Sequence, residues 1–246
     1  MRAPSCRATS CRNSDNLAQM NETVQKPRRA GAPKKSAAAA EPRTNDPERT
    51  MADILAVATQ EFADKGLSGA RIDEIAAATR TSKRMIYYYF GSKEGLYVAV
   101  LEEAYRRIRS IEAELHLEDL PPEDALRKLV GFTFDYQLAN PDFIRLVMNE
   151  NMHRGVFLAQ SKSVQQLNVP AIQAVRSIYE RGVKEGVFRG GVDPIDLHMS
   201  VSALCFFNVS NRHTFSLIFK RDLDSPRSIG ARRDSIIEMV VRHVRK

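Results

Sequence analysis

The chain has 246 residues, of which 43% are hydrophobic, and it carries 37 Lys+Arg against 30 Asp+Glu for a formal net charge of +7. This apolar content excludes wholesale disorder, three cysteines are too few for a disulfide framework, and the longest apolar run is about half of the ~20 residues that a membrane span needs. Residues 1–45 hold nine Lys/Arg and three Asp/Glu, whereas residues 46–246 hold 28 and 27. The body is therefore nearly neutral, and any affinity for nucleic acid must come from local arrangement.

Residues 1–45 are predicted to form a disordered basic arm, because they lack apolar periodicity and contain the run KPRRAGAPKK from Lys26 to Lys35. The arm either contacts DNA phosphates or is a solvated leader, and Met20 is an alternative to Met1 as the true start. The segment has no apolar core of a secretory signal. We therefore expect a cytoplasmic protein with reduced thiols and no membrane association.

A first folded unit is expected over residues 46–107. Asp46-Pro47 suits a helix start, and Met51, Ile54, Leu55, Ala58 and Phe62 recur at helical spacing until Lys65-Gly66. A short helix over 72–76, a turn over 77–81 and a third helix over 82–88 follow, and Ser92 then caps a longer helix. Three short helices with a tight turn between the second and third predict a helix-turn-helix.

The third helix of this unit carries DNA-binding chemistry. Lys83 and Arg84 lie at its N-terminal end, where the helix dipole favours phosphate, and three tyrosines, 87–89, follow. Between Thr79 and Lys93 the sequence has four basic residues and no acid. The alternative is that Ile86, Tyr88 and Phe90 are core residues, which we expect of Ile86 and Phe90.

The rest of the chain, 108–246, is predicted to be helical. Expected helices cover 122–139, 143–151, 157–167, 170–184, 194–219 and 229–244, and the stretch 129–138 is apolar on nearly every face, as in a buried helix. Two apolar faces suggest either an association surface or internal core; they comprise Ile172, Val175, Ile178, Tyr179 and Val183 on one helix and Leu197, Val201, Leu204 and Phe207 on the next.

Catalytic constellations are sparse in the sequence. Glu150 and His153 form a single Glu-x-x-His pair, which carboxylate-bridged metal bundles contain twice, so a surface or pocket-edge hydrogen bond is the better interpretation. Glu112 and His116 are expected to be a solvated helix pair, and Cys205 a small buried residue. We therefore predict no enzyme, no metal site and no cofactor.

The stretch RIDEIAAATRTSKRMIYYYFGSKEGLYVAVL, with ILAVATQEFADKG before it, resembles the tetracycline-repressor (TetR) family of bacterial transcription regulators. The resemblance covers roughly residues 47–107. It implies an all-α protein whose N-terminal three-helix helix-turn-helix domain is followed by a helical ligand-binding and dimerisation domain. Two departures stand out: Ala70-Arg71 replaces the usual Thr cap of the second helix, and Tyr89 replaces a frequent His or Asn.

The resemblance also implies function and partners. The chain would be a repressor, binding a palindromic double-stranded DNA operator as a homodimer and released from it by a small-molecule effector. Alternatives are a helical domain that binds a protein partner and, least favoured, an all-helical enzyme. The expected DNA contacts are Arg71, Thr81, Ser82, Lys83, Arg84, Tyr87, Tyr88, Tyr89 and Lys93. The expected effector-pocket residues, aromatic and Met-rich, are Phe132, Phe134, Tyr136, Phe143, Met148, Met152, His153, Phe157 and Phe206; each would also serve as plain core.

Overall fold

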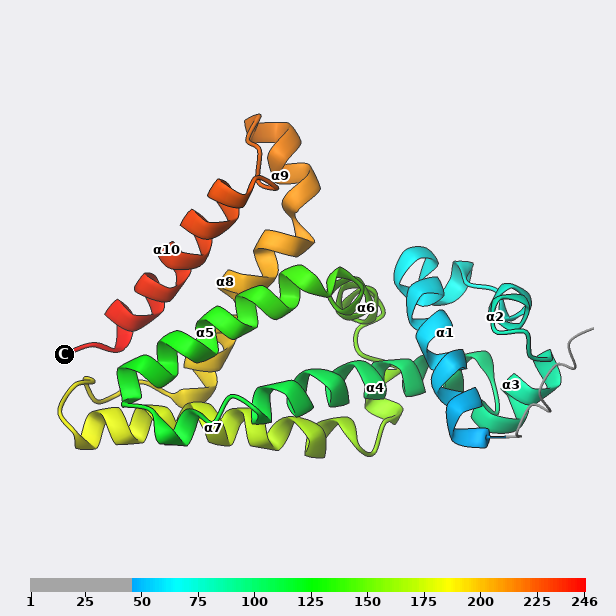
Figure 1. Ribbon diagram of the computed structural model, residues 1–246, viewed down its shortest axis with the longest axis horizontal. Helices are drawn as coiled ribbons and strands as arrows, with labels where there is room; N and C mark the ends of the chain where they lie inside the picture. The colour runs from blue at the N-terminus through cyan, green and yellow to red at the C-terminus, as the bar shows by residue number, and fades with distance from the viewer. Residues whose placement is uncertain (1–45) are drawn as a thin grey trace, which may run out of the picture. The chain divides into compact units, whose positions relative to one another are not determined.

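The computed structural model describes residues 46–246, and within that range it consists of α-helices joined by short loops (Figure 1). The arm predicted over 1–45, the alternative start Met20, and Cys6 and Cys11 lie outside the described residues. The α-helices are α1 (Pro47–Gly69), α2 (Ile72–Ala78), α3 (Lys83–Phe90), α4 (Lys93–Ala113), α5 (Pro122–Ala139), α6 (Pro141–Met152), α7 (Val164–Lys184), α8 (Pro194–Ser210), α9 (Arg212–Phe219) and α10 (Pro226–Val244). Short 3-10 helices η1 (Leu117–Asp119) and η2 (Leu158–Gln160) complete the order. The all-helical fold class is thus confirmed for the described residues.

Helix α1 begins and breaks where its sequence dictates. The Asp46 side chain accepts a hydrogen bond of 3.1 Å from the backbone N–H of Arg49, and Pro47 occupies the first helical turn. Gly66 adopts φ +66°, which interrupts the helix before its last three residues. The interruption lets the chain turn toward α2.

The first core joins α1, α2, α3, the N-terminal half of α4 and one residue of α6. Its fully buried side chains include Ile54, Phe62, Ile86, Tyr97 and Leu146. The Phe62 and Tyr97 rings meet edge to face with centroids 5.1 Å apart. Since Leu146 comes from α6, the helix-turn-helix unit shares its core with the helical body.

The second core surrounds α5, which packs against α7, α8 and α10 (Figure 1). Leu126, Leu129, Val130 and Phe134 of α5 are all at most 3% exposed. Burial on several faces explains why this stretch is apolar almost all round. Helix α4 runs without a break from the first core to contacts with α5 and α7, across the expected domain boundary at 107/108.

Two predicted helix boundaries are wrong. Helix α7 runs straight through Pro170, and residues 157–163 form a turn with η2 instead of a helix. Pro170 and Gln166 are both exposed, so the carbonyl that loses its N–H partner reaches water and the helix continues. The helix expected over 194–219 divides at Asn211, whose side chain donates a 2.8 Å hydrogen bond to Ser210 Oγ.

The apolar faces noted in the sequence are largely internal. Val175, Ile178 and Tyr179 of α7 and Leu197 and Val201 of α8 are all at most 6% exposed in the second core. The interpretation as core therefore holds for these five residues. Val183 and Phe207, noted with them, are 37% and 44% exposed, and Phe207 lies on an outward-facing stripe of α8.

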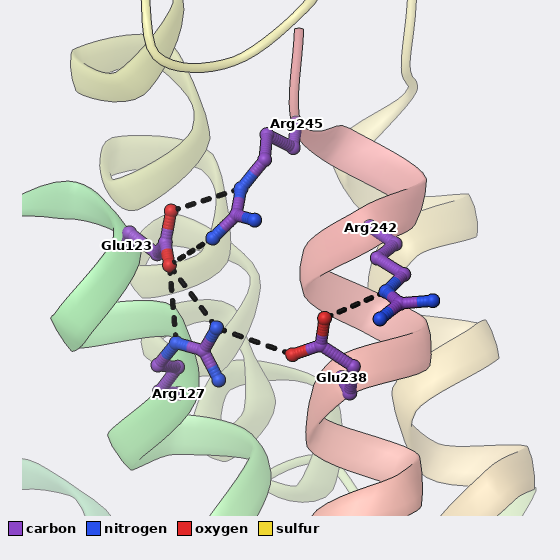
Figure 2. A network of polar contacts seen from close by, with 5 residues as sticks. All are labelled: Glu123, Arg127, Glu238, Arg242 and Arg245. Atoms are coloured by element: carbon purple, nitrogen blue, oxygen red, sulfur yellow. Dashed lines mark hydrogen bonds and ion pairs between the residues drawn. The ribbon is translucent and has the colours of Figure 1, made fainter.

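A charged network ties α5 to the C-terminal half of α10 (Figure 2). Glu123 accepts hydrogen bonds from Arg127 at 3.1 Å and from Arg245 at 2.5 Å, and Arg127 also pairs with Glu238 at 3.3 Å. Glu238 in turn accepts from Arg242 at 2.6 Å. The network fixes the end of the chain against the start of α5.

Candidate nucleic-acid interface and internal cavity

The turn between α2 and α3 has a tight, capped geometry. Ser82 is the N-cap of α3, and its Oγ accepts a 3.2 Å hydrogen bond from the backbone N–H of Met85. Arg80, in the turn itself, adopts the left-handed φ of +53°, a conformation that costs a non-glycine residue free energy. Helix α2, the turn and helix α3 therefore form a helix-turn-helix, with α3 in the position of the recognition helix.

One face of α3 is open to solvent and the other is anchored. Ile86 is fully buried and Phe90 packs against the first core, as the sequence predicts. Lys83 and Arg84 are exposed, and Tyr87 and Tyr88 are 45% and 78% exposed. Tyr88 is therefore not a core residue, and exposed aromatic rings beside two cations suit a DNA surface.

The remaining predicted DNA contacts surround this face. Ser82 and Arg71 are exposed, while Thr81, Tyr89 and Lys93 are partly buried. The Tyr89 ring packs against the first core and meets Tyr88 edge to face at 5.3 Å. Arg71 is the N-cap of α2 and has no side-chain cap of its own; instead its backbone N–H donates to Glu61 Oε1 at 3.1 Å.

An acid that the sequence reading overlooked lies beside the basic residues. Asp73, at the start of α2, is 2.5 Å from Lys83 Nζ and 3.8 Å from Arg71. The hydrogen bond from Lys83 is the main cause that lowers the pKa of the Asp73 carboxyl. A DNA phosphate must therefore compete with Asp73 for Lys83, whereas no ion pair of Arg84 is found within residues 46–246.

A cavity of about 210 Å³ lies among α4, α5, α6, α7 and α8. Its aromatic wall consists of Tyr105, Phe132, Phe143 and Phe206. Tyr105 and Phe143 meet edge to face at 5.4 Å. Three of the residues expected in an effector pocket, namely Phe132, Phe143 and Phe206, are thus brought together.

The other expected pocket residues lie elsewhere. Tyr136 lines a separate groove of about 580 Å³ between α1 and α6, which Phe143 also borders. Phe134 is core, Met148 is 37% and Met152 78% exposed, and Phe157 packs on Tyr97 at 5.5 Å. His153 Nδ1 lies 2.7 Å from the Asn149 carbonyl and does not reach the cavity lining.

The polar lining of the cavity was not anticipated. Arg109 and Glu112 form an ion pair at the cavity, and Glu112 is 9% exposed, so it is not the solvated partner of His116 that the sequence suggested. Burial raises the Glu112 pKa, and Arg109 opposes this shift. The sequence does indicate this burial, because Glu112 continues the helical spacing of Leu101, Tyr105 and Ile108 on the inner face of α4.

Gln137 of α5 and His198 of α8 complete the polar lining. Gln137 is 5% exposed, and burial lowers the His198 pKa, with Arg109 adding to the effect. His198 is therefore an uncharged ring at neutral pH.

The side chains considered as catalytic candidates, Glu150 and Cys205, are buried in the protein interior. Glu150 is buried and its Oε1 accepts from the backbone N–H groups of Phe157 and Leu158 at 2.9 and 2.8 Å, so the expected surface or pocket-edge bond to His153 is wrong. Burial raises the pKa of Cys205 to about 12, which keeps it a thiol.

The potential metal ligands that gather within residues 46–246, His116, Glu118 and Asp119, are all exposed. No helix of the described residues is long and apolar enough to cross a membrane.

Comparisons with known proteins agree with this geometry. Residues 54–100 match the model of bacterial regulatory proteins of the tetR family, and residues 122–240 match the tetracyclin repressor-like C-terminal domain. The HTH-type transcriptional repressor NicS of Pseudomonas putida is 38% identical over 181 residues, which cover 74% of this chain and 85% of NicS. The HTH-type transcriptional repressor SCO4008 of Streptomyces coelicolor is 37% identical over 139 residues, covering 56% and 69% of the two chains.

Solved structures extend the likeness to the fold. The crystal structure of SCO4942 from Streptomyces coelicolor has a TM-score of 0.60 at 28% identity and covers 79% of this chain and 98% of its own. A tetR-family regulatory protein from Rhodococcus RHA1 has a TM-score of 0.62 at 19% identity, covering 80% and 97%.

The fold and the exposed face of α3 define a helix-turn-helix DNA-binding protein with a helical body. The chain belongs to the tetR family of bacterial regulatory proteins. It is a DNA-binding regulator of transcription, and its family is one of regulators and not of enzymes.

Proposed function

We propose that the protein is a homodimeric repressor that binds a palindromic operator through α3 and is released by a small molecule bound in the 210 Å³ cavity. The observation that carries the DNA part is the solvent-facing side of α3, where Arg84 and Tyr88 are exposed beside a capped turn. In this reading residues 46–107 are the DNA-binding domain and residues 108–246 bind ligand and partner.

The proposed DNA contacts divide by their chemistry. Lys83, Arg84, Tyr87 and Tyr88 on the exposed face of α3 enter the major groove and meet its backbone. The flanking residues position the helix on phosphates or support it from behind; they are Arg71, Thr81, Ser82, Tyr89 and Lys93.

An outward stripe of α8 supports the homodimer. Ile195, Met199 and Phe207 are 54%, 62% and 44% exposed, and Ala203 fills the same register between them. Met239 of α10, a helix that packs against α8, is also 40% exposed. An exposed apolar surface of this kind suits a second copy of the chain, and two-fold pairing would present two α3 helices to two half-sites.

Helix α6 supports a route from cavity to DNA. Phe143 and Val147 of α6 line the cavity. On the same helix, Arg145 pairs with Asp64 of α1 at 2.5 Å and Asn149 donates to the Phe62 carbonyl at 3.3 Å. A ligand that shifts α6 therefore shifts α1 and, through it, α2 and α4, against which the recognition helix α3 packs. Such a shift changes the population of the DNA-binding conformation.

The test is selection of DNA fragments by the purified full chain, followed by footprinting of the retained sites. We expect protection of two inverted half-sites about one helical turn, roughly 10 bp, apart. Retention of fragments no better than bulk DNA would overturn the proposal.

A further inference from the structure

Two polar atoms in the cavity lining lack partners. Gln137 is 5% exposed, and its Oε1 has no hydrogen-bond partner among the described protein atoms. Arg109 Nε, on the facing helix α4, is likewise buried without a partner. The first atom needs a donor and the second an acceptor, and a buried polar group left without either is costly. An occupant of the cavity must therefore supply both.

The charges of the lining balance. Arg109 is already paired with Glu112, and burial together with Arg109 lowers the His198 pKa, so His198 is uncharged at neutral pH. An anionic ligand would meet a cation whose charge Glu112 already compensates. A cationic ligand would meet Arg109 itself. The cavity therefore favours a molecule without net charge.

The walls and the volume limit the ligand's shape. Tyr105, Phe132, Phe143 and Phe206 surround the space with aromatic rings, which pack well on a flat ring. The volume, about 210 Å³, lies below the roughly 300–1,000 Å³ of pockets that hold drug-sized ligands. One ring with small substituents fits this size.

We propose that the cavity binds an uncharged single-ring amide, whose N–H donates to Gln137 and whose carbonyl oxygen accepts from Arg109. An amide carries a donor and an acceptor in one planar, uncharged group, and a ligand binds well in a buried polar site only if it satisfies both atoms. This inference rests on the proposed function for the role of the cavity, but it concerns binding alone.

Binding of three probes of similar size to the full chain tests the proposal by calorimetry and thermal shift. They are 2-pyridone as the neutral cyclic amide, benzoate as the anion, and toluene as the apolar ring. We expect 2-pyridone to bind and to raise the melting temperature, and the Gln137→Leu variant to bind it about tenfold more weakly. Gln173→Leu, at an exposed position of α7 outside the cavity lining, is the matched control and should bind like the wild type.

Three results would overturn the proposal. Preferential binding of benzoate would mean that the site takes an anion, equal binding of toluene would mean that the unpaired atoms recognise nothing, and no binding of 2-pyridone at millimolar concentration would exclude the class. Near-ultraviolet circular dichroism checks that Gln137→Leu is folded. DNA affinity is measured separately: if 2-pyridone binds but leaves DNA affinity unchanged, the effector role of the cavity fails while its ligand chemistry stands.

Discussion

Gly91 ends the recognition helix in a backbone conformation that other residues adopt at a cost. Its φ is +76°, its N–H donates to the Tyr87 carbonyl at 2.9 Å, and a Cβ at this position would meet no described atom within 4 Å. Gly91→Ala should therefore lose about 1 kcal/mol of unfolding free energy from backbone strain alone. That loss corresponds to a melting temperature roughly 2–4 °C lower, measurable by calorimetry.

Gly190 provides the control for this prediction. A Cβ there also meets no described atom within 4 Å, but its φ lies outside the left-handed region. Gly190→Ala should therefore leave the melting temperature unchanged or slightly raise it. Equal effects of the two substitutions would contradict the backbone explanation.

Single residues also show where sequence reasoning stops. The capping serines and the buried Ile86 were predictable, because caps and helical spacing are local properties. The pairing of Lys83 with Asp73 was not, because it joins two helices across the turn. The segment from Thr79 to Lys93 contains no acid, but folding places Asp73 of α2 beside it.

At the scale of elements, the network between α5 and α10 makes stability depend on pH. Arg245, followed by Arg127, lowers the pKa of Glu123 below that of a free glutamate. A lowered pKa means that the ionised form is stabilised on folding, so this contribution is full above the unfolded pKa of about 4.3 and is lost as the pH falls below it.

Glu123→Gln should therefore reduce the unfolding free energy by about 1 kcal/mol at pH 7, with a smaller difference from the wild type as the pH falls from 5 to 3. Urea denaturation across this range measures both. Glu180→Gln, at an exposed position on α7, is the control and should change little at any of these pH values. A difference that grows toward low pH would refute the assigned pairing.

Helix boundaries were predictable where residues at the boundary itself determine them. Pro122 and Asn140 bound α5 as expected, because a proline suits the first turn and the residue before Pro141 avoids helical angles. Pro170 misled the prediction because the cost of a proline within a helix depends on its surroundings. Here the carbonyl of Gln166, which has no N–H partner at Pro170, is open to water. Likewise, whether an apolar face of α7 or α8 is core or surface depends on which helices pack against it.

At the scale of the whole molecule, the outward stripe of α8 predicts the assembly state. The wild-type chain should be a dimer at micromolar concentration by multi-angle light scattering. Met199→Lys places a charge in the centre of the stripe and should yield a monomer with an unchanged helical circular dichroism spectrum. Met152→Lys, at a 78% exposed position of α6, should remain dimeric. A monomeric wild type, or a dimeric Met199→Lys, would contradict the proposed interface.

The central claim, that α3 reads DNA, is tested most directly by the salt dependence of operator binding, measured by fluorescence anisotropy. Arg84→Ala and Lys83→Ala should weaken binding and make the plot of log K against log salt shallower, by roughly one unit per lost phosphate contact and so about two per dimer. Arg106→Ala, an exposed arginine of α4, should match the wild type. If both α3 variants bind the operator as tightly as the wild type, with the same slope, α3 is not the recognition helix.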